Sequence, residues 1–385
     1  MPLDRERVTS KSWSGRDVQL RAVAAELSRV HAELSHSETG DREHPRPRNC
    51  VLNLIVAVGD EEREDSAEQV ISAIATGHPL RAIVLHSNAE DGERLDAEIK
   101  AEAHHLVRGA SVQLEQVTLD VHGLAGMHPA SLVEPLLVPD VPTYLWWTGS
   151  PPLDEPALHD ALNACDALIV DSAHFADRVR SFLDLAALAE RIRDRVGFVD
   201  LQWARQKPWR ETVAQLFAPG GRRPQLRGLH RVMLECVGQG AGNRIPAILF
   251  AGWLAAALGW RPTRRVSVTE SAAEVLLEGG EERVVELICR AGEHPGLGDG
   301  ELRALEIEGQ TGRRRLTARM EIRPDRADHA HLELDINGAA TIQQRLPMPR
   351  EDEDKLLLHA LSALRRDAVY LRSLDAAARL LEALR

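Results

Sequence analysis

A glycine-rich loop is the first segment of this sequence that could bind a ligand. Gly238 to Asn243 read GQGAGN between a strand-like and a helix-like segment, where backbone amides can hold a phosphate. The spacing is GxGxG, not GxGxxG, and no Lys-Ser or Lys-Thr follows as in a P-loop. The next acidic residue, Glu270, is too distant to bind a ribose. We therefore expect a flexible turn that is capped by Asn243. The alternative that remains is a loop that binds another ligand, such as a sugar phosphate.

The first strand-like run ends in a turn that would repel phosphate. IVAVGDEERED has the strand–turn–helix order of a dinucleotide-binding fold, which has glycines at this turn. Here the turn and the following residues are acidic: Asp60, Glu61, Glu62, Glu64 and Asp65. We therefore expect a Rossmann-like fold that binds no cofactor.

Asp171 and Ser172 end another strand-like run, where α/β folds place ligand sites. No GxSxG motif surrounds the serine, so we expect these residues to cap the next turn rather than to hydrolyse a substrate. The close histidine pairs are His104-His105 and His329 with His331. Such pairs on polar segments rarely form a complete metal site without a carboxylate or cysteine placed nearby, so we expect surface or hydrogen-bonded histidines. We therefore predict neither catalytic nor metal-ligating residues.

Tryptophan is the most distinctive residue type in the chain. Trp146 and Trp147 are adjacent in a strand-like run, so their side chains point to opposite faces. Trp203 and Trp209 flank the last strand–helix unit. Tryptophan is enriched at protein–protein hot spots, although large residues also fill the core between two domains. Our hypothesis is that these four residues contribute to a partner-binding surface, with an interdomain core as the alternative.

Strand-like and helix-like segments alternate over residues 46–218. Strand-like runs cover residues 50–58, 81–87, 111–120, 142–148, 167–172 and 197–204. Helix-like runs cover residues 67–77, 92–106, 124–140, 154–165, 177–193 and 208–218. This alternation predicts a doubly wound, Rossmann-like α/β domain.

The segments on either side follow other patterns. Residues 1–45 contain helical periodicity over 16–35 and then a polar, proline-containing stretch, which predicts a helical arm and linker outside the main fold. The break APGGRRPQ ends at residue 225. Residues 225–385 have a helix-like run over 243–259, alternating strands, an Asn337-Gly338 hairpin signal and two closing helices. We predict an α+β domain with an antiparallel sheet.

Composition excludes several classes of protein. The formal net charge is −12 over 385 residues, which disfavours a whole-surface affinity for nucleic acid or for an anionic membrane. The 4 cysteines are far apart, with no zinc or thioredoxin spacing, as is usual in a reducing cytoplasm. The polar N-terminus has no apolar signal segment, and no apolar run is long enough to span a membrane.

Four segments follow one another in the chain: VPTYLWWTGSPPLDEP, DALIVDSAHFAD, DLQWARQKPWRETVAQLF and LFAGWLAAALGW. Together they resemble the OpcA family, the glucose-6-phosphate dehydrogenase assembly proteins of bacteria. The resemblance implies a non-catalytic cytoplasmic protein that binds glucose-6-phosphate dehydrogenase and promotes its active oligomer in the oxidative pentose phosphate pathway. Some members are under redox control by cysteines, but this sequence has no closely spaced cysteine pair.

Two other functions stay open at this point. One is an enzyme that acts on a sugar phosphate at the C-terminal edge of the first sheet, using the GQGAGN loop. The other is a sensor that binds a small ligand in the same cleft and signals to a partner.

Overall fold

The computed structural model describes residues 8–39, 50–58, 64–88, 92–105, 111–218, 223–238, 243–280, 283–338, 341–362 and 367–385. The chain forms two compact units. The first comprises residues 1–170, 192–199 and 353–365, and the second comprises residues 171–191, 200–352 and 366–385. The chain thus passes between the units several times, which differs from the predicted boundaries at 46–218 and 225–385. Sequence periodicity identifies a helix but does not tell against which core it packs.

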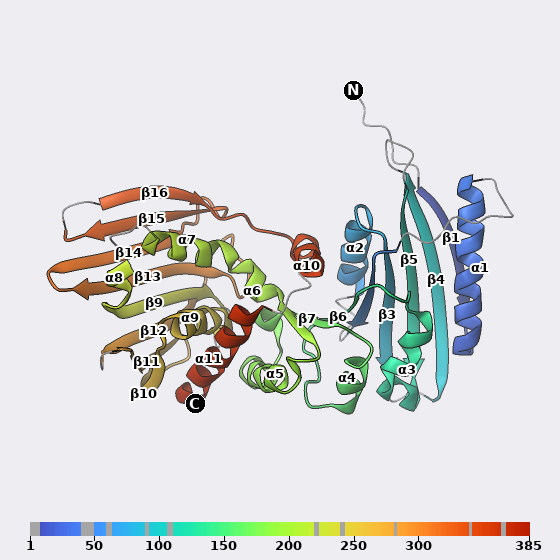
Figure 1. Ribbon diagram of the computed structural model, residues 1–385, viewed down its shortest axis with the longest axis horizontal. Helices are drawn as coiled ribbons and strands as arrows, with labels where there is room; N and C mark the ends of the chain where they lie inside the picture. Colours follow the sequence, from blue (N-terminus) through green and yellow to red (C-terminus); the bar gives the residue numbers. More distant parts are fainter. Residues whose placement is uncertain are drawn as a thin grey trace, which may run out of the picture. The chain divides into compact units, whose positions relative to one another are not determined.

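The first unit is built on an eight-stranded sheet in the order β1-β4-β5-β3-β2-β6-β7-β8 (Figure 1). The strands are β1 (Val8–Gly15), β2 (Leu52–Val58), β3 (Leu80–Asn88), β4 (Arg94–His105), β5 (Ser111–His122), β6 (Thr143–Thr148), β7 (Ala167–Val170) and β8 (Gly197–Asp200). Strands β5, β3, β2, β6 and β7 are parallel to one another. Without β1 and β4, the order of the other six is that of a Rossmann fold, which confirms the predicted mixed α/β class.

The predicted helix over residues 92–106 is wrong, because this segment forms strand β4. Ala97, Ile99, Ala101 and Ala103 are all buried, and they alternate with charged residues. The period is therefore two, which is that of a strand with one buried face. The Ala, Glu and Lys content favours a helix, but burial of one face of the strand between β1 and β5 outweighs this propensity.

The N-terminal segment belongs to the first unit and is not an outlying arm. Strand β1 pairs with β4 in antiparallel register, from Val8 opposite His104 to Gly15 opposite Ala97. The helix predicted over 16–35 is present as α1 (Leu20–Thr39) and buries Val23, Leu27, Val30 and Leu34. The predicted helix over residues 92–106 offers no strand edge, so the sequence gives no reason to expect that residues 8–15 form a paired strand.

The other helices of the first unit are short. They are α2 (Glu64–Ala75), α3 (Pro129–Val133), α4 (Pro156–Ala161) and α10 (Glu353–Ser362). The helix-like run over 124–140 is interrupted, with 3-10 turns at Gly123–Met127 and Glu134–Leu136 on either side of α3. Helix α10, near the end of the chain, joins this unit because the Tyr144 hydroxyl donates to the carbonyl of Leu361 at 2.8 Å.

The second unit has its own eight-stranded sheet, in the order β10-β11-β12-β9-β13-β14-β15-β16. The strands are β9 (Leu229–Val237), β10 (Arg261–Val268), β11 (Ala272–Glu278), β12 (Val284–Gly292), β13 (Leu302–Thr311), β14 (Arg314–Ile322), β15 (His329–Ile336) and β16 (Thr341–Pro347). The predicted antiparallel sheet needs one correction, since β9 and β12 are parallel. Asn337 and Gly338, with φ of 62° and 69°, form the predicted hairpin turn.

The helices of the second unit include two that lie side by side on the sheet, α9 (Ile245–Leu258) and α11 (Ala368–Leu384) (Figure 1). The others are α5 (Arg178–Ile192), α6 (Leu201–Arg205), α7 (Lys207–Phe217) and α8 (Arg223–Leu226). Helix α9 ends at Gly259, whose φ of 71° confirms the predicted glycine stop. A Cβ atom on Gly252 would lie 2.4 Å from the carbonyl oxygen of Ser373, so the two helices meet at this glycine. Within the described parts of the chain, no helix combines the length and the apolar character that a membrane span requires.

Candidate functional site

The two adjacent tryptophans of β6 occupy different environments. Strand β6 lies between β2 and β7, and Trp146 pairs with Val56 and Ile169. Trp146 is buried in the core of the first unit, at 2% exposure, while Trp147 is partly exposed. The indole nitrogen of Trp147 is covered and has no hydrogen-bond partner among the described residues. Of the predicted pair, Trp147 is therefore the one whose ring is accessible.

The other two predicted tryptophans are buried in the second unit, Trp203 at 8% and Trp209 at 5% exposure. The Trp203 indole donates to Asp367 at 2.8 Å, and its ring centroid lies 5.6 Å from that of Tyr370. The guanidinium of Arg210 lies 3.4 Å from the Trp203 ring centroid, a cation–π contact. Burial lowers the pKa of Arg210 to about 10, so the group stays charged at neutral pH. Trp203 thus fastens α11 to α6 and α7.

A buried carboxylate, Asp171, follows strand β7. Both nitrogens of the Arg205 fork donate to it, with Nη1 2.9 Å from Oδ1, and Nδ1 of His174 lies 3.0 Å from Oδ2. Burial alone would raise the pKa of Asp171, but the hydrogen bonds from His174 and Arg205 outweigh burial and lower it. The side chain also accepts from the amide of Ala173 at 3.3 Å, so the predicted capping of this turn is confirmed.

A second buried carboxylate, Asp200, follows in the same unit. It accepts from the Ser172 hydroxyl at 2.6 Å and from the Ser172 and Gln202 amides at 3.1 and 2.9 Å. The Tyr370 hydroxyl lies 3.3 Å from Oδ2. Burial, and next the negative charge of Asp171, raise the pKa of Asp200 to about 6, against the lowering effect of the Ser172 hydrogen bonds. The pKa of Asp171 is thus lowered, whereas the pKa of the neighbouring Asp200 is raised.

The hydrogen bonds of Asp171, Ser172 and Asp200 stabilise the local fold, and their geometry is not that of a catalytic centre. Ser172 is completely buried and donates to a carboxylate, so its hydroxyl can neither reach a substrate nor transfer its proton to a histidine. His174, two residues further along the chain, contacts Asp171 instead. Sequence reasoning identified the Asp171-Ser172 pair but missed Asp200, Arg205 and Tyr370. The sequence signal for Asp200 and Arg205 is that both are polar residues of the DLQWAR segment. Tyr370 has no such signal, because it is distant in the chain.

The GQGAGN loop lies partly outside the described residues, at 239–242. Its last residue, Asn243, is fully buried. The Asn243 amide donates to the carbonyl of Ala173 at 2.7 Å and to Asp299 at 3.1 Å. The N-cap of α9 is Arg244, which makes no capping bond through its side chain. The predicted cap by Asn243 is therefore wrong, because its amide bonds to the segment after β7. The acidic turn predicted to repel phosphate also lies mostly outside the described residues.

The cysteines and histidines offer little chemistry in the described residues. All four cysteines are free, and Cys236 and Cys289 are buried on the neighbouring strands β9 and β12. Burial raises the pKa of Cys236 to about 12, so the reactive thiolate is scarce at neutral pH. His104 and His329 lie near Glu102 and Asp328 respectively. No described group of three or more His, Cys, Asp or Glu residues could hold a metal ion.

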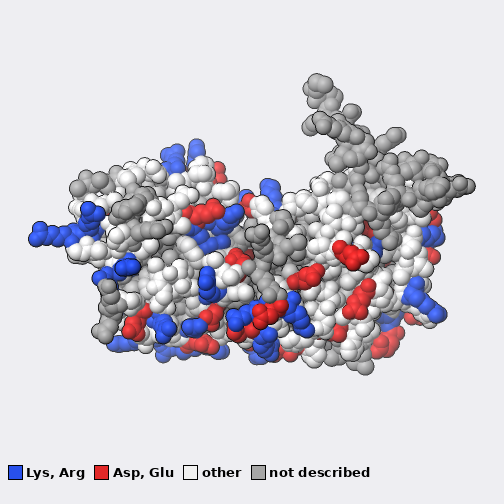
Figure 2. Space-filling view, in the orientation of Figure 1, with Lys and Arg blue, Asp and Glu red and all other residues white. Residues whose placement is uncertain are grey.

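The surface charge is mixed on the face shown in Figure 2. Lys and Arg side chains are interspersed there with Asp and Glu over the described residues. The visible part of the described surface therefore presents both signs of charge.

Comparison with known families and relatives gives a consistent result. Residues 71–187 match the family model of the glucose-6-phosphate dehydrogenase subunit N-terminal domain, and residues 196–374 match that of its C-terminal domain. A candidate OxPP cycle protein OpcA from Synechocystis sp. is 28% identical over 195 residues, which are 50% of this chain and 40% of that protein. The corresponding protein of Synechococcus elongatus is 28% identical over 193 residues, which are 50% and 42% of the two chains. The match thus spans less than half the length of these curated relatives.

The solved structures to which the chain shows similarity are distant from it. An oxidoreductase from Sinorhizobium meliloti is 10% identical, with a TM-score of 0.48 over 86% of this chain and 95% of that chain. A likeness at this level contributes nothing to the functional assignment.

Proposed function

Because the chain belongs to the OpcA family of glucose-6-phosphate dehydrogenase subunits, we propose that it binds glucose-6-phosphate dehydrogenase and promotes the active oligomer of that enzyme. The observation that carries the proposal is that the chain matches both the N-terminal and the C-terminal domain of the family, over residues 71–187 and 196–374. The protein acts by binding and has no turnover of its own. A cytoplasmic location follows from the proposed partner.

One of the predicted contacts is compatible with a binding role. Trp147 is partly exposed, although its indole nitrogen is covered. Trp146, Trp203 and Trp209 are at most 8% exposed, so a partner reaches them only after a rearrangement. We therefore keep Trp147 as the proposed contact, and we assign the other three tryptophans to the packing of the units in which they lie.

Activation by binding has a simple thermodynamic form. A partner that binds the active oligomer more tightly than the inactive form shifts that equilibrium by the difference in binding free energy, and by no more. At saturation, a ten-fold preference shifts the equilibrium ten-fold, which corresponds to about 1.4 kcal/mol.

The test combines purified protein with its cognate dehydrogenase. Adding the full chain at micromolar concentration should lower the glucose 6-phosphate concentration for half-maximal rate, or shift the dehydrogenase to a larger species in sedimentation. The chain alone, after repeated purification, should neither oxidise glucose 6-phosphate nor hydrolyse a sugar lactone. An unchanged rate and sedimentation would contradict the binding role, and persistent turnover by the chain alone would contradict the non-catalytic one.

A further inference from the structure

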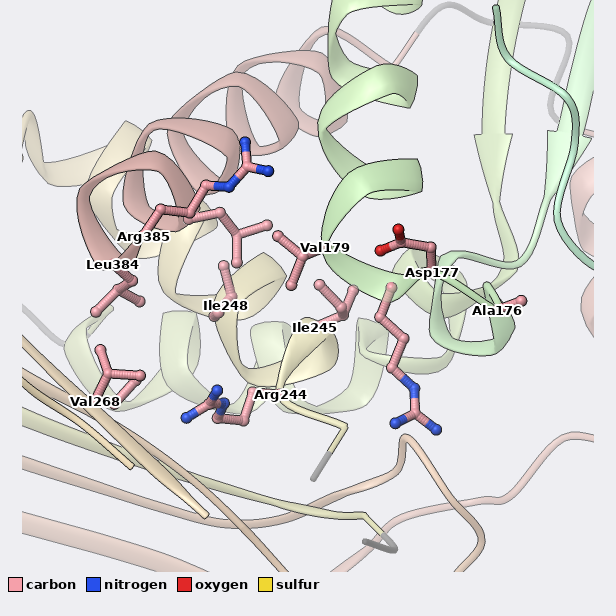
Figure 3. Close-up of a pocket in the computed structure, with 12 residues that line it drawn as sticks. Ala176, Asp177, Val179, Arg244, Ile245, Ile248, Val268, Leu384 and Arg385 are labelled. Carbon is pink, nitrogen blue, oxygen red and sulfur yellow. The ribbon is translucent and has the colours of Figure 1, made fainter. Parts of the chain in front are cut away.

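A cavity of about 520 Å³ lies in the second unit, where helices α5 and α9 begin and α11 ends (Figure 3). It is lined by Ala176, Asp177, Arg178, Val179, Arg244, Ile245, Ile248, Val268, Ala273, Leu381, Leu384 and Arg385. All these residues belong to the same unit. The volume is within the range of sites that bind small molecules.

The floor and mouth of the cavity are apolar. Ile245, Ile248 and Leu381 form a buried floor, each at most 4% exposed. Val179 and Val268 also line the cavity, and they are 37% and 43% exposed. Large apolar side chains that are open to water around a concave site favour a ligand that covers them, because burying their surface is favourable at roughly 25 cal/mol per Å².

Three arginines give the rim a positive charge. Arg178 lies 3.2 Å from Asp299, and Arg244 uses one nitrogen to donate to the carbonyl of Thr269 at 2.9 Å. The Arg385 guanidinium makes no ion pair with the described residues, whereas the main-chain oxygen of Arg385 accepts from Arg265 at 2.6 Å. Figure 3 shows Arg244 and Arg385 on opposite sides of the apolar group. Two guanidinium groups thus keep donors available for an anion.

The helix ends add to this field unequally. The carboxylate of Asp177 accepts from the amide of Arg180 at 3.1 Å and so caps the start of α5. Helix α9 has no side-chain cap at Arg244, so the positive end of its dipole lies at the cavity, while the C-terminal end of α11 contributes the opposite sign. Among the described lining residues Asp177 is acidic, and Asp299 neutralises Arg178. The positive charge available to a ligand is therefore that of Arg244 and Arg385.

We propose that this cavity binds a small amphiphilic anion, which is a single phosphate or carboxylate group on an apolar body. The apolar body fills the space over Ile245 and Ile248, and the anionic group lies at the rim, where Arg244 on one side and Arg385 on the other are the candidate donors. This inference goes beyond the proposed function and does not depend on it, because the ligand binds to the isolated chain.

Four probes separate the parts of the proposal, by calorimetric titration of the full chain below the micellar concentration. Octyl phosphate should bind at one saturable site. Octyl glucoside tests the apolar body without charge, and inorganic phosphate tests the charge without the body; both should bind at least about ten-fold more weakly. Octanoate tests the head group, and whichever of octanoate and octyl phosphate binds more tightly identifies the preferred anion. Equal affinity for octyl glucoside, or no saturable binding of either anion, would overturn the proposal.

Matched variants locate the site. Either Arg244→Ala or Arg385→Ala should weaken octyl phosphate binding about ten-fold or more, and the variant that does so identifies the guanidinium that holds the head group. Arg379→Ala is the control on α11, because Arg379 is exposed and pairs with Asp375. Val268→Trp should block the mouth.

The control for Val268→Trp is Val266→Trp on the same strand, since Val266 is 44% exposed and does not line the cavity. Thermal melting confirms that each variant is folded. If both arginine variants and Val268→Trp bind octyl phosphate as the unaltered chain does, the anion binds elsewhere and the proposal is wrong.

Discussion

Replacement of Asp200 by Asn should stabilise the second unit at neutral pH and leave its stability nearly unchanged near pH 4. The buried carboxylate accepts hydrogen bonds from Ser172 and Gln202, and its pKa is raised to about 6 by burial and by the charge of Asp171. An amide has the same shape. Its oxygen can accept from the two backbone amides at Oδ1, and its NH₂ group can donate to the Ser172 and Tyr370 hydroxyls.

The magnitude follows from the pKa difference between the folded and unfolded states. The folded value of about 6 exceeds the ordinary 3.8 by about 2. Between about pH 4 and pH 6 the folded chain therefore keeps a proton that the unfolded chain has released, and stability falls as the pH rises. At 1.36 kcal/mol for each unit of pKa, ionisation of Asp200 costs about 3 kcal/mol above pH 6. Asn cannot ionise, so the variant avoids this loss.

Urea unfolding of both proteins, at several values between about pH 4 and pH 7, measures the effect. The stability difference in favour of Asp200→Asn should rise from near zero to about 3 kcal/mol over this range. Asp171→Asn is the matched comparison with the opposite sign, because it removes the buried negative charge that Arg205 and His174 bind, and it should cost about 3 kcal/mol or more at neutral pH. A difference for Asp200→Asn that does not change with pH, or a loss equal to that of Asp171→Asn, would refute the opposite roles assigned to the two acids.

Three further predictions concern packing and the proposed partner. Gly252→Ala should lower stability by about 3 kcal/mol in thermal or urea unfolding, because the new Cβ atom would lie 2.4 Å from the Ser373 carbonyl oxygen; a fully stable variant would show that α9 and α11 are not in close contact. Trp146→Ala should cost about 3–5 kcal/mol because the side chain is buried in the core. Trp147→Ala should leave the chain folded but weaken the complex with the dehydrogenase by about 2 kcal/mol, measured by titration calorimetry; an unchanged affinity would remove Trp147 from the interface.

The regular strands and helices were predictable because each buries a periodic apolar set. Strand β2 reads LNLIVAV and is buried on both faces, as expected for a central parallel strand. Strand β4 shows the limit of such reasoning, because its Ala, Glu and Lys residues favour a helix while its alternation favours a strand. Only pairing with β5 and β1, 111–122 and 8–15 in the chain, decides between the two.

The polar networks were much less predictable, since they depend on contacts between residues distant in the chain. Asp200 and Tyr370 are separated by 170 positions, and Asn243 and Ala173 by 70. Periodicity contains no information on such pairs. The four tryptophans illustrate the same difficulty, because the sequence shows that they are unusual but not which of them are buried. Their exposure depends on the order of strands and helices around each ring.

One consequence of the strand order explains why the N-terminal helix is part of the first unit. In a Rossmann fold, a helix connects successive parallel strands and covers the sheet. Here strand β4 takes the place of such a helix between β3 and β5. Helix α1 is held to this part of the sheet by His31, whose Nδ1 lies 2.7 Å from Glu115 on β5, and Glu115 is in turn paired with Arg81 on β3. Helix α1 packs mainly on β4 and β1, and the Arg81–Glu115 pair that His31 contacts is almost fully buried. The N-terminal segment therefore supplies a helix for the part of the sheet where the β3–β5 connection is a strand.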